Sequence, residues 1–178
     1  MVGISWMLSV AMLLGVASSS AAGLVVTSES YREGDAIPTK YGADVCGGGG
    51  VSPQVGWSGL PDATKSVVVL LIDADGANGL SVPHWLAYNI SPARAYLREG
   101  EGERASPGIT LGLNVSSDMA YRGMCPPVGD TPHHYYLSVI ATDLTPGSLR
   151  PGLNREQLMT SLRGHALQGQ SYFARYGR

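Results

Sequence analysis

The sequence predicts a mainly β fold of antiparallel sheets with a few peripheral helices. The 178 residues include 24 Gly and 11 Pro, which is typical of a chain rich in turns and short strands. The clearest apolar run, SVVVLLI at residues 66–72, is β-branched and has the length of a buried strand. A helical pattern appears only late, at residues 154–167, so the chain lacks the strand–helix alternation of a parallel sheet.

The individual elements follow from local patterns along the chain. Residues 66–72 are apolar without interruption, so this strand is expected to be buried on both faces. In the helix, Asn154 is placed to cap the N-terminus, Leu158, Leu162 and Leu167 share one side, and Gly164 is expected to end or bend it. Residues 91–120 are expected to be irregular, with a solvated charged run at 98–104. The predicted strands are residues 24–28, 55–57, 66–72, 85–90 and 135–142.

The N-terminus predicts export. No charged side chain precedes Glu29, and residues 4–16 form an apolar run too short to span a bilayer comfortably. Ser20 and Ala22 fit a small-x-small cleavage pattern. We therefore predict a cleaved signal peptide at residues 1–22 and a mature single domain at residues 23–178, secreted or periplasmic, with no membrane span. The lack of Lys or Arg in the first segment keeps an uncleaved anchor as the alternative.

Charge and cysteine content narrow the classes of partner. The formal net charge of −2 gives no basic footprint, so nucleic acid is not expected as a partner. Cys46 and Cys125 are the two cysteines, and neither lies in a CxxC or CxxH spacing, which disfavours zinc. In an oxidising compartment one disulfide is plausible, and two unpaired thiols are the alternative.

A small polar pocket is predicted where a turn rich in Gly and Pro, residues 121–129, leads into a strand. Residues two apart on a strand share a face, so His133 and Tyr135 should point one way and His134 and Tyr136 the other. The latter pair is expected to be structural.

A second group of polar residues lies at other strand ends. Asp73 and Asp75 follow the buried strand, and His84 begins the next one. The ordinary interpretation is that the carboxylates form a turn and that His84 packs beside Trp85. A calcium loop fails because Ala77 and His84 stand at the fifth and twelfth positions. A His/Asp metal site is chemically feasible but unspecific, so no metal and no cofactor are predicted.

Ordered together, these motifs resemble those of the phosphatidylethanolamine-binding protein (PEBP) family, in the bacterial Raf-kinase-inhibitor-like branch (YbhB/YbcL type). The resemblance covers essentially the whole mature chain. Ala74 and Ala77 depart from the family pattern, which has prolines there, and Met124 replaces a frequent Pro. The blocks that carry the resemblance are residues 34–38, 52–57, 73–77, 84–85, 112–114, 121–129 and 133–135, with 164–165 and 176–178 at the end.

The resemblance implies two packed antiparallel sheets and a surface pocket for an anionic group such as phosphate. It also implies a binding or inhibitory protein rather than an enzyme. Exported relatives often carry a cysteine pair at the loop positions of Cys46 and Cys125, which favours a disulfide between them. Carried over by motif, the ligand-binding residues would be Asp73, Asp75, His84, Pro126, His133 and Tyr135, with Tyr121 at the rim.

The predicted function is therefore an exported protein that binds a small anionic or phosphorylated ligand, such as a phospholipid headgroup, with modulation of a partner protein as an associated role. We hypothesise that Asp73 or Asp75 holds His84 or His133 protonated or correctly oriented, so that binding strengthens as the pH falls toward 6. Two alternatives remain. The protein could inhibit a protease or kinase through surface loops such as residues 91–120, or it could hydrolyse a phosphoester with His and Asp. The oligomeric state is left open.

Overall fold

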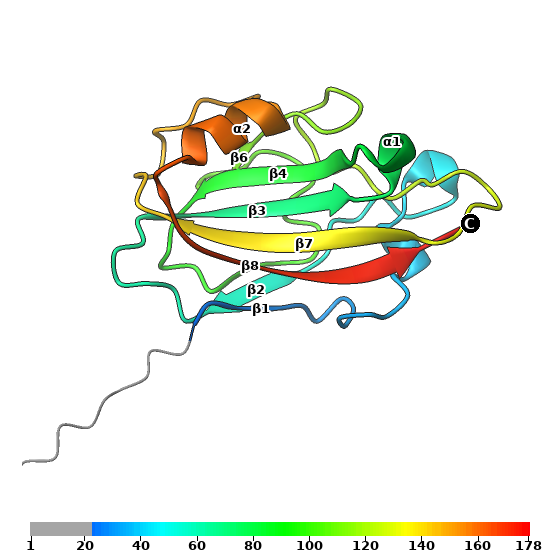
Figure 1. Ribbon diagram of the computed structural model, residues 1–178, viewed down its shortest axis with the longest axis horizontal. Helices are drawn as coiled ribbons and strands as arrows, with labels where there is room; N and C mark the ends of the chain where they lie inside the picture. The colour runs from blue at the N-terminus through cyan, green and yellow to red at the C-terminus, as the bar shows by residue number, and fades with distance from the viewer. Residues whose placement is uncertain (1–22) are drawn as a thin grey trace, which may run out of the picture.

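The computed structural model describes residues 23–178, and the predicted signal peptide at residues 1–22 lies outside the described residues. The described chain forms two antiparallel sheets (Figure 1). The larger sheet has five strands in the order β6-β4-β3-β7-β8, and the smaller has three in the order β1-β2-β5. The strands are β1 (Val25–Thr27), β2 (Val55–Ser58), β3 (Ser66–Asp73), β4 (Val82–Ile90), β5 (Tyr96–Leu97), β6 (Thr110–Leu111), β7 (His133–Thr142) and β8 (Ala166–Tyr176).

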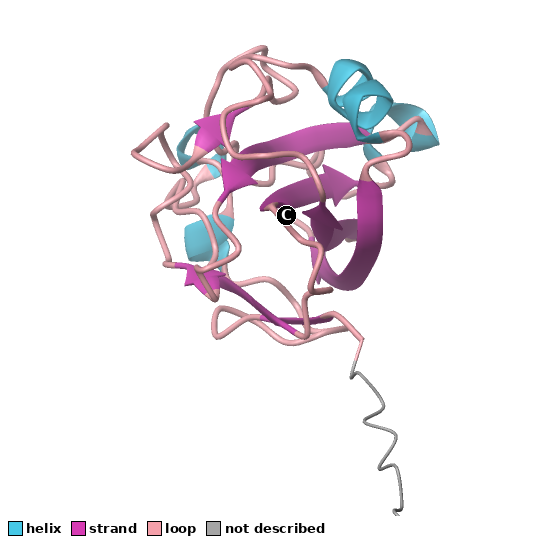
Figure 2. Ribbon diagram, turned by 90° about the vertical axis from the view of Figure 1, so that its left-hand side faces the viewer, coloured by secondary structure: helices cyan, strands magenta, loops and turns pink. Residues whose placement is uncertain are grey.

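The helices are short and lie outside the strand layers (Figure 2). They are the 3₁₀ helices η1 (Thr39–Tyr41) and η2 (Asp44–Cys46) and the α-helices α1 (Gly76–Gly79) and α2 (Arg155–Leu162). The predicted mainly β fold of packed antiparallel sheets with a few peripheral helices is thus confirmed. Among the described residues, no helix has the length and apolarity needed to cross a membrane.

The main core lies between the two sheets. Val67, Val69 and Leu71 project from one face of β3 and are completely buried. Trp57 of β2 and Leu97 of β5 belong to the same cluster and come from the smaller sheet. Alternate residues of a strand share a face, so this half of β3 joins the two sheets.

A second core lies on the opposite face of the larger sheet. Val68 and Leu70, the intervening residues of β3, pack with Leu158 and Leu162 of α2. The expectation that this strand is buried on both faces is confirmed. As predicted, Asn154 caps α2: its side chain accepts the backbone N–H of Gln157, while the Gln157 side chain accepts the backbone N–H of Asn154.

The helix ends before Gly164, as expected, but the residues after Gly164 do not continue it. The helix ends at Leu162, Gly164 takes a left-handed φ of 78°, and the chain then forms the edge strand β8. Leu167 therefore lies on β8, 39% exposed, and not on the helix. The first half of β8 is mostly exposed and polar, which hides the alternation that would have marked it as a strand. Residues 91–120 are largely irregular as expected, but they contain the two-residue strands β5 and β6.

Candidate functional site

A pocket of about 510 Å³ opens beside the end of β3, the start of β4 and the start of β7. The loop after β3, residues 115–116, and the turn that precedes β7 complete its walls. The antiparallel pairing brings these strand ends together, because Asp73 on β3 pairs with Val82 on β4 and Tyr135 on β7. Of the predicted site residues, the pocket is lined by Asp73, Asp75, His84, Pro126 and His133.

Asp73 is the buried centre of this site, with 3% of its surface exposed. Its Oδ1 accepts hydrogen bonds from the backbone N–H groups of Asp75 (3.0 Å) and Gly76 (2.9 Å). These bonds fold the turn that leaves β3, so the ordinary turn-forming interpretation is correct. The other oxygen, Oδ2, is 2.9 Å from Nδ1 of His133. One carboxylate therefore serves both the turn and the pocket.

His133 is the best-placed hydrogen-bond donor in the pocket. A carboxylate only accepts, so Nδ1–H of His133 donates to Asp73, and Nε2 is left 3.7 Å from Oδ2 of Asp130. Partial burial by itself lowers the pKa of His133, but the hydrogen bond and the charge of Asp73, helped by Asp75 and Asp130, leave that pKa raised above its ordinary value. The hypothesis of a protonated histidine therefore fits His133.

His84 has the opposite character. It is 5% exposed, and its Nδ1 is 2.9 Å from the carbonyl oxygen of Arg122, to which it must donate. Desolvation by burial lowers the pKa of His84 and outweighs the opposing effects of the Arg122 carbonyl and of Asp73. The imidazole is thus neutral at pH 7, and its unprotonated Nε2, 3.9 Å from Asp73 Oδ2, is an acceptor at the edge of the pocket. His84 is oriented rather than held protonated.

Asp75 lines the pocket but is engaged on its far side. Its Oδ2 accepts hydrogen bonds from the backbone N–H (2.7 Å) and from Nδ1 (2.9 Å) of His134. These bonds, the backbone one first, lower the pKa of Asp75. Its carboxylate therefore orients neither His84 nor His133. His134 itself projects from the other face of β7, as the strand alternation predicted.

The two predicted tyrosines do not line the pocket. Tyr135 lies behind it and is 1% exposed. Its ring makes an edge-to-face contact with His84 (5.3 Å between centroids) and is stacked with His133 (6.5 Å). Tyr121 was expected at the rim, and this was wrong. It is 7% exposed, its ring packs against Trp85, and its hydroxyl donates to the carbonyl of Tyr41 (2.6 Å). A large ring beside the apolar core is more stable buried than at an open rim.

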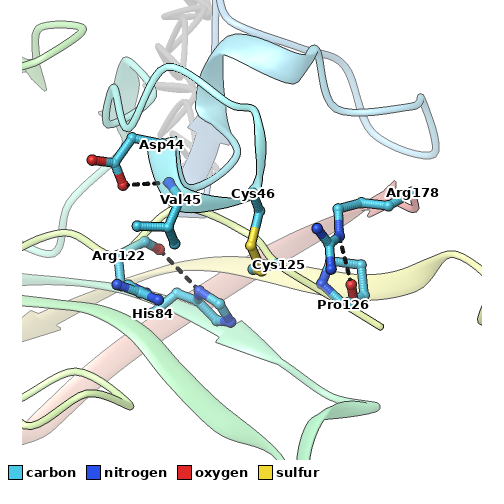
Figure 3. The surroundings of a disulfide bond; sticks show 8 residues. All are labelled: Asp44, Val45, Cys46, His84, Arg122, Cys125, Pro126 and Arg178. Atoms are coloured by element: carbon cyan, nitrogen blue, oxygen red, sulfur yellow. Dashed lines mark hydrogen bonds between the residues drawn. A yellow bond between two sulfur atoms is a disulfide. The ribbon is translucent and has the colours of Figure 1, made fainter. Parts of the chain in front are cut away.

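The wall around Pro126 is fixed by contacts from distant segments. The structure pairs Cys125, which lines the pocket, with Cys46 in a disulfide whose Cα atoms are 5.9 Å apart (Figure 3). The carbonyl of Pro126 accepts a hydrogen bond from Nε of Arg178 (2.8 Å; Figure 3). Gly123 lies directly on the backbone of residues 42–43, where a Cβ would come within 2.3 Å of backbone atoms. This wall is therefore held rigidly.

The opposite wall differs from the family pattern in its backbone. Ala77, at the second position where the pattern has a proline, takes a left-handed φ of 53° and lines the pocket. Proline is fixed near −65°, so it could not adopt this conformation. The turn after β3 therefore has a backbone conformation that a chain with proline at position 77 could not form.

Sequence reasoning missed two charged pocket residues. Arg122 lies within the predicted turn and Asp130 just after it, and both line the pocket. Their neighbouring Gly and Pro residues were used to identify the turn, while their charges gave no separate signal. Across residues 23–178, no cluster of three or more His, Cys, Asp or Glu residues has the arrangement needed to hold a metal ion.

The fold and the site together define a β-rich protein with a small polar pocket at the strand ends. The family profile described as phosphatidylethanolamine-binding protein matches residues 27–177. The chain therefore belongs to the phosphatidylethanolamine-binding protein family.

Individual relatives agree with this assignment. A UPF0098 protein from Aquifex aeolicus is 32% identical over 162 residues, covering 90% of this chain and 92% of its own length. The crystal structure of Escherichia coli YbcL, described as a member of the mammalian PEBP family, superposes with a TM-score of 0.82 at 29% identity, covering 88% and 99% of the two chains. A PEBP homologue from Chlamydia trachomatis superposes with a TM-score of 0.76 at 32% identity, covering 88% and 98%.

Proposed function

We propose that this protein is an exported binding protein whose pocket at Asp73 takes up a phosphate group, free or as a monoester. The single observation that carries the proposal is the Asp73–His133 hydrogen bond. It fixes the tautomer of His133, favours its cation, and directs Nε2–H toward the pocket. Arg122 also lines the pocket. Of the pocket's three carboxylates, those of Asp73 and Asp75 are already hydrogen-bonded to His133 and His134.

The two histidines suit an anion that still carries one proton. His133 offers a donor at Nε2, whereas neutral His84 offers an acceptor at Nε2. A singly protonated phosphate has both an oxygen that accepts from His133 and a P–OH that donates to His84. A fully deprotonated anion would leave the lone pair of His84 facing another acceptor, which is unfavourable.

The pH dependence follows from these protonation states. The pKa of His133 is raised, so its charged fraction grows as the pH falls from 8 toward 6. A phosphate monoester has a second pKa of about 6, so its singly protonated form grows over the same range. Both changes strengthen binding as the pH falls. The carboxylate of Asp130 near His133 opposes a fully charged anion at higher pH.

Isothermal titration calorimetry with ethyl phosphate at pH 6, 7 and 8 tests the proposal. Loss of one charge-assisted hydrogen bond should make His133→Gln bind about 10- to 100-fold more weakly at pH 6. His165→Gln is the matched control, because this imidazole also bonds to an aspartate, Asp143 (2.8 Å), but neither residue lines the pocket, so affinity should be unchanged. Affinity that is flat or rises with pH, or an equal loss in both variants, would contradict the proposal.

The same variants separate the two alternatives that the sequence left open. A hydrolase would release phosphate from ethyl phosphate, and this turnover would fall in Asp73→Asn. An inhibitor that acts through residues 91–120 would keep its activity in His133→Gln. The binding proposal expects no turnover and a loss in His133→Gln.

A further inference from the structure

A second hollow, also of about 510 Å³, lies at the smaller sheet and shares no lining residue with the pocket at Asp73. We call it the Tyr96 hollow. None of its residues is a defining residue of a family motif, although Gln54 lies within the block at residues 52–57. Its lining consists of Glu29, Ser30, Gln54, Tyr96, Arg98 and Glu99.

The sheet geometry exposes the ring of Tyr96. Tyr96 on β5 pairs with Gly56 on β2, and the adjacent pair, Val55 and Leu97, is completely buried in the core. Successive residues of a strand face opposite sides, so Tyr96 projects outward. Gly56 has no side chain to cover the ring from across the ladder, and Tyr96 is 44% exposed. The result is a flat aromatic surface open to solvent.

The polar groups around this ring are held in place by the backbone. Oε1 of Gln54 accepts from the backbone N–H of Glu29 (2.7 Å), and the backbone N–H of Gln54 donates to Oγ of Ser30 (2.8 Å). The amide Nε2 of Gln54 makes no hydrogen bond to any described residue. It is thus a fixed donor without a protein partner.

The carboxylate of Glu99 is also fixed, but by two side chains. It accepts hydrogen bonds from Nζ of Lys40 (2.8 Å) and from the hydroxyl of Tyr41. The side-chain bond to Lys40, followed by that to Tyr41, lowers the pKa of Glu99, so this group is ionised at neutral pH.

The charges in and beside the hollow cancel. Glu29 and Glu99 supply two negative charges, while Arg98 and the neighbouring Lys40 supply two positive ones. A balanced site of this kind has no strong preference for an ion. It does present carboxylate, amide and guanidinium groups, each of which offers paired hydrogen-bonding atoms in one plane. Adjacent hydroxyl groups on a ring match such pairs.

We propose that the Tyr96 hollow binds a sugar ring of a neutral saccharide. The apolar C–H face of the ring would stack on Tyr96, and its hydroxyls would bond to Gln54, Arg98 and the glutamates. A small zwitterion such as L-glutamine fits less well, because it has no ring that could stack on Tyr96. The proposal does not depend on the function proposed for the pocket at Asp73.

Saturation-transfer-difference NMR on the purified protein tests this with cellobiose, maltose and N,N′-diacetylchitobiose as probes. We expect transfer to the ring protons of at least one of them. Tyr96→Ala should weaken that binding about tenfold or more, whereas Tyr96→Phe should keep it within about threefold, because stacking needs the ring and not the hydroxyl.

Tyr136→Ala is the matched control. Tyr136 is 40% exposed but lies on β7 of the other sheet, so its loss should leave saccharide binding unchanged. His133→Gln should also leave it unchanged, which separates this site from the phosphate site. The proposal is overturned if no disaccharide shows saturation transfer, if Tyr96→Ala and Tyr136→Ala behave alike, or if L-glutamine binds and the disaccharides do not.

Discussion

Replacing Asp73 with Asn should destabilise the protein in a way that depends on pH. Asp73 is 3% exposed, and its carboxylate accepts three hydrogen bonds, two from the backbone N–H groups of Asp75 and Gly76 and one from His133. The amide oxygen of Asn can keep the two backbone bonds. The amide nitrogen then faces Nδ1–H of the His133 cation at low pH, so two donors oppose each other.

The magnitude follows from that one lost bond. A hydrogen bond between charged groups contributes about 1.5–3 kcal/mol, and a buried donor left unpaired adds to the loss. We expect the free energy of unfolding of Asp73→Asn to fall by about 2–3 kcal/mol at pH 6. With a urea dependence of about 1–3 kcal/mol per M, the unfolding midpoint should fall by about 0.7–3 M.

The pH dependence of this loss in unfolding free energy shows whether it comes from the Asp73–His133 ion pair or from altered packing. The pKa of His133 is raised in the folded protein, so its stabilising contribution is fully present below the pKa of the unfolded chain and is lost as the pH rises through the folded pKa. The difference between wild type and Asp73→Asn should therefore be larger at pH 6 than at pH 8. Urea unfolding monitored by tryptophan fluorescence at both pH values measures it. An equal difference at the two pH values would refute the reasoning.

Three further outcomes can be checked on the same preparation. Inorganic phosphate should bind more tightly than sulfate at pH 6 by calorimetry, because sulfate has no proton to donate to His84. Equal affinities would contradict the role of His84 Nε2 as a neutral hydrogen-bond acceptor. Asp130→Asn should strengthen ethyl phosphate binding about two- to fivefold at pH 7, since a carboxylate 3.7 Å from Nε2 of His133 no longer competes with the ligand, while the larger effect of Asp73 on the pKa of His133 remains. Replacing Cys46 and Cys125 with Ser should lower the free energy of unfolding by about 2–4 kcal/mol in urea, and no change would mean that the cross-link is dispensable.

The sequence predicted the structure best where a residue pattern is compatible with only one kind of element and one pattern of burial. Residues 66–72 are apolar on both faces, and only a central strand of a sheet that is covered on both sides, here by the smaller sheet and by α2, accommodates such a run. The alternation of His133 through Tyr136 likewise set which side chains share a face. Edge strands are less constrained, because half of their residues face water. This is why β8 was missed and why Leu167 was assigned to a helix.

The membership of the site was harder to predict than its location. Spacing along the chain placed Asp73, His84 and His133 at strand ends, and the antiparallel register joins these ends. Spacing carries no information on what each carboxylate contacts. Asp75 therefore looked equivalent to Asp73 in sequence, although its carboxylate turns to His134 on the other side of the strand. Tyr121 was misplaced for a similar reason, since its motif position does not reveal the burial of its ring.

The two interpretations of Asp73, as a turn former and as a site residue, are not alternatives. Its Oδ1 closes the turn after β3 through two backbone hydrogen bonds, and this fixes the position of Oδ2. Oδ2 then lies 2.9 Å from His133 and 3.9 Å from His84, close enough to favour the cation of the first without overcoming the desolvation of the second. One rigid carboxylate thus leaves a charged donor and a neutral acceptor side by side. A variant that restored the turn without the carboxylate would keep the fold and lose this distinction between the two histidines.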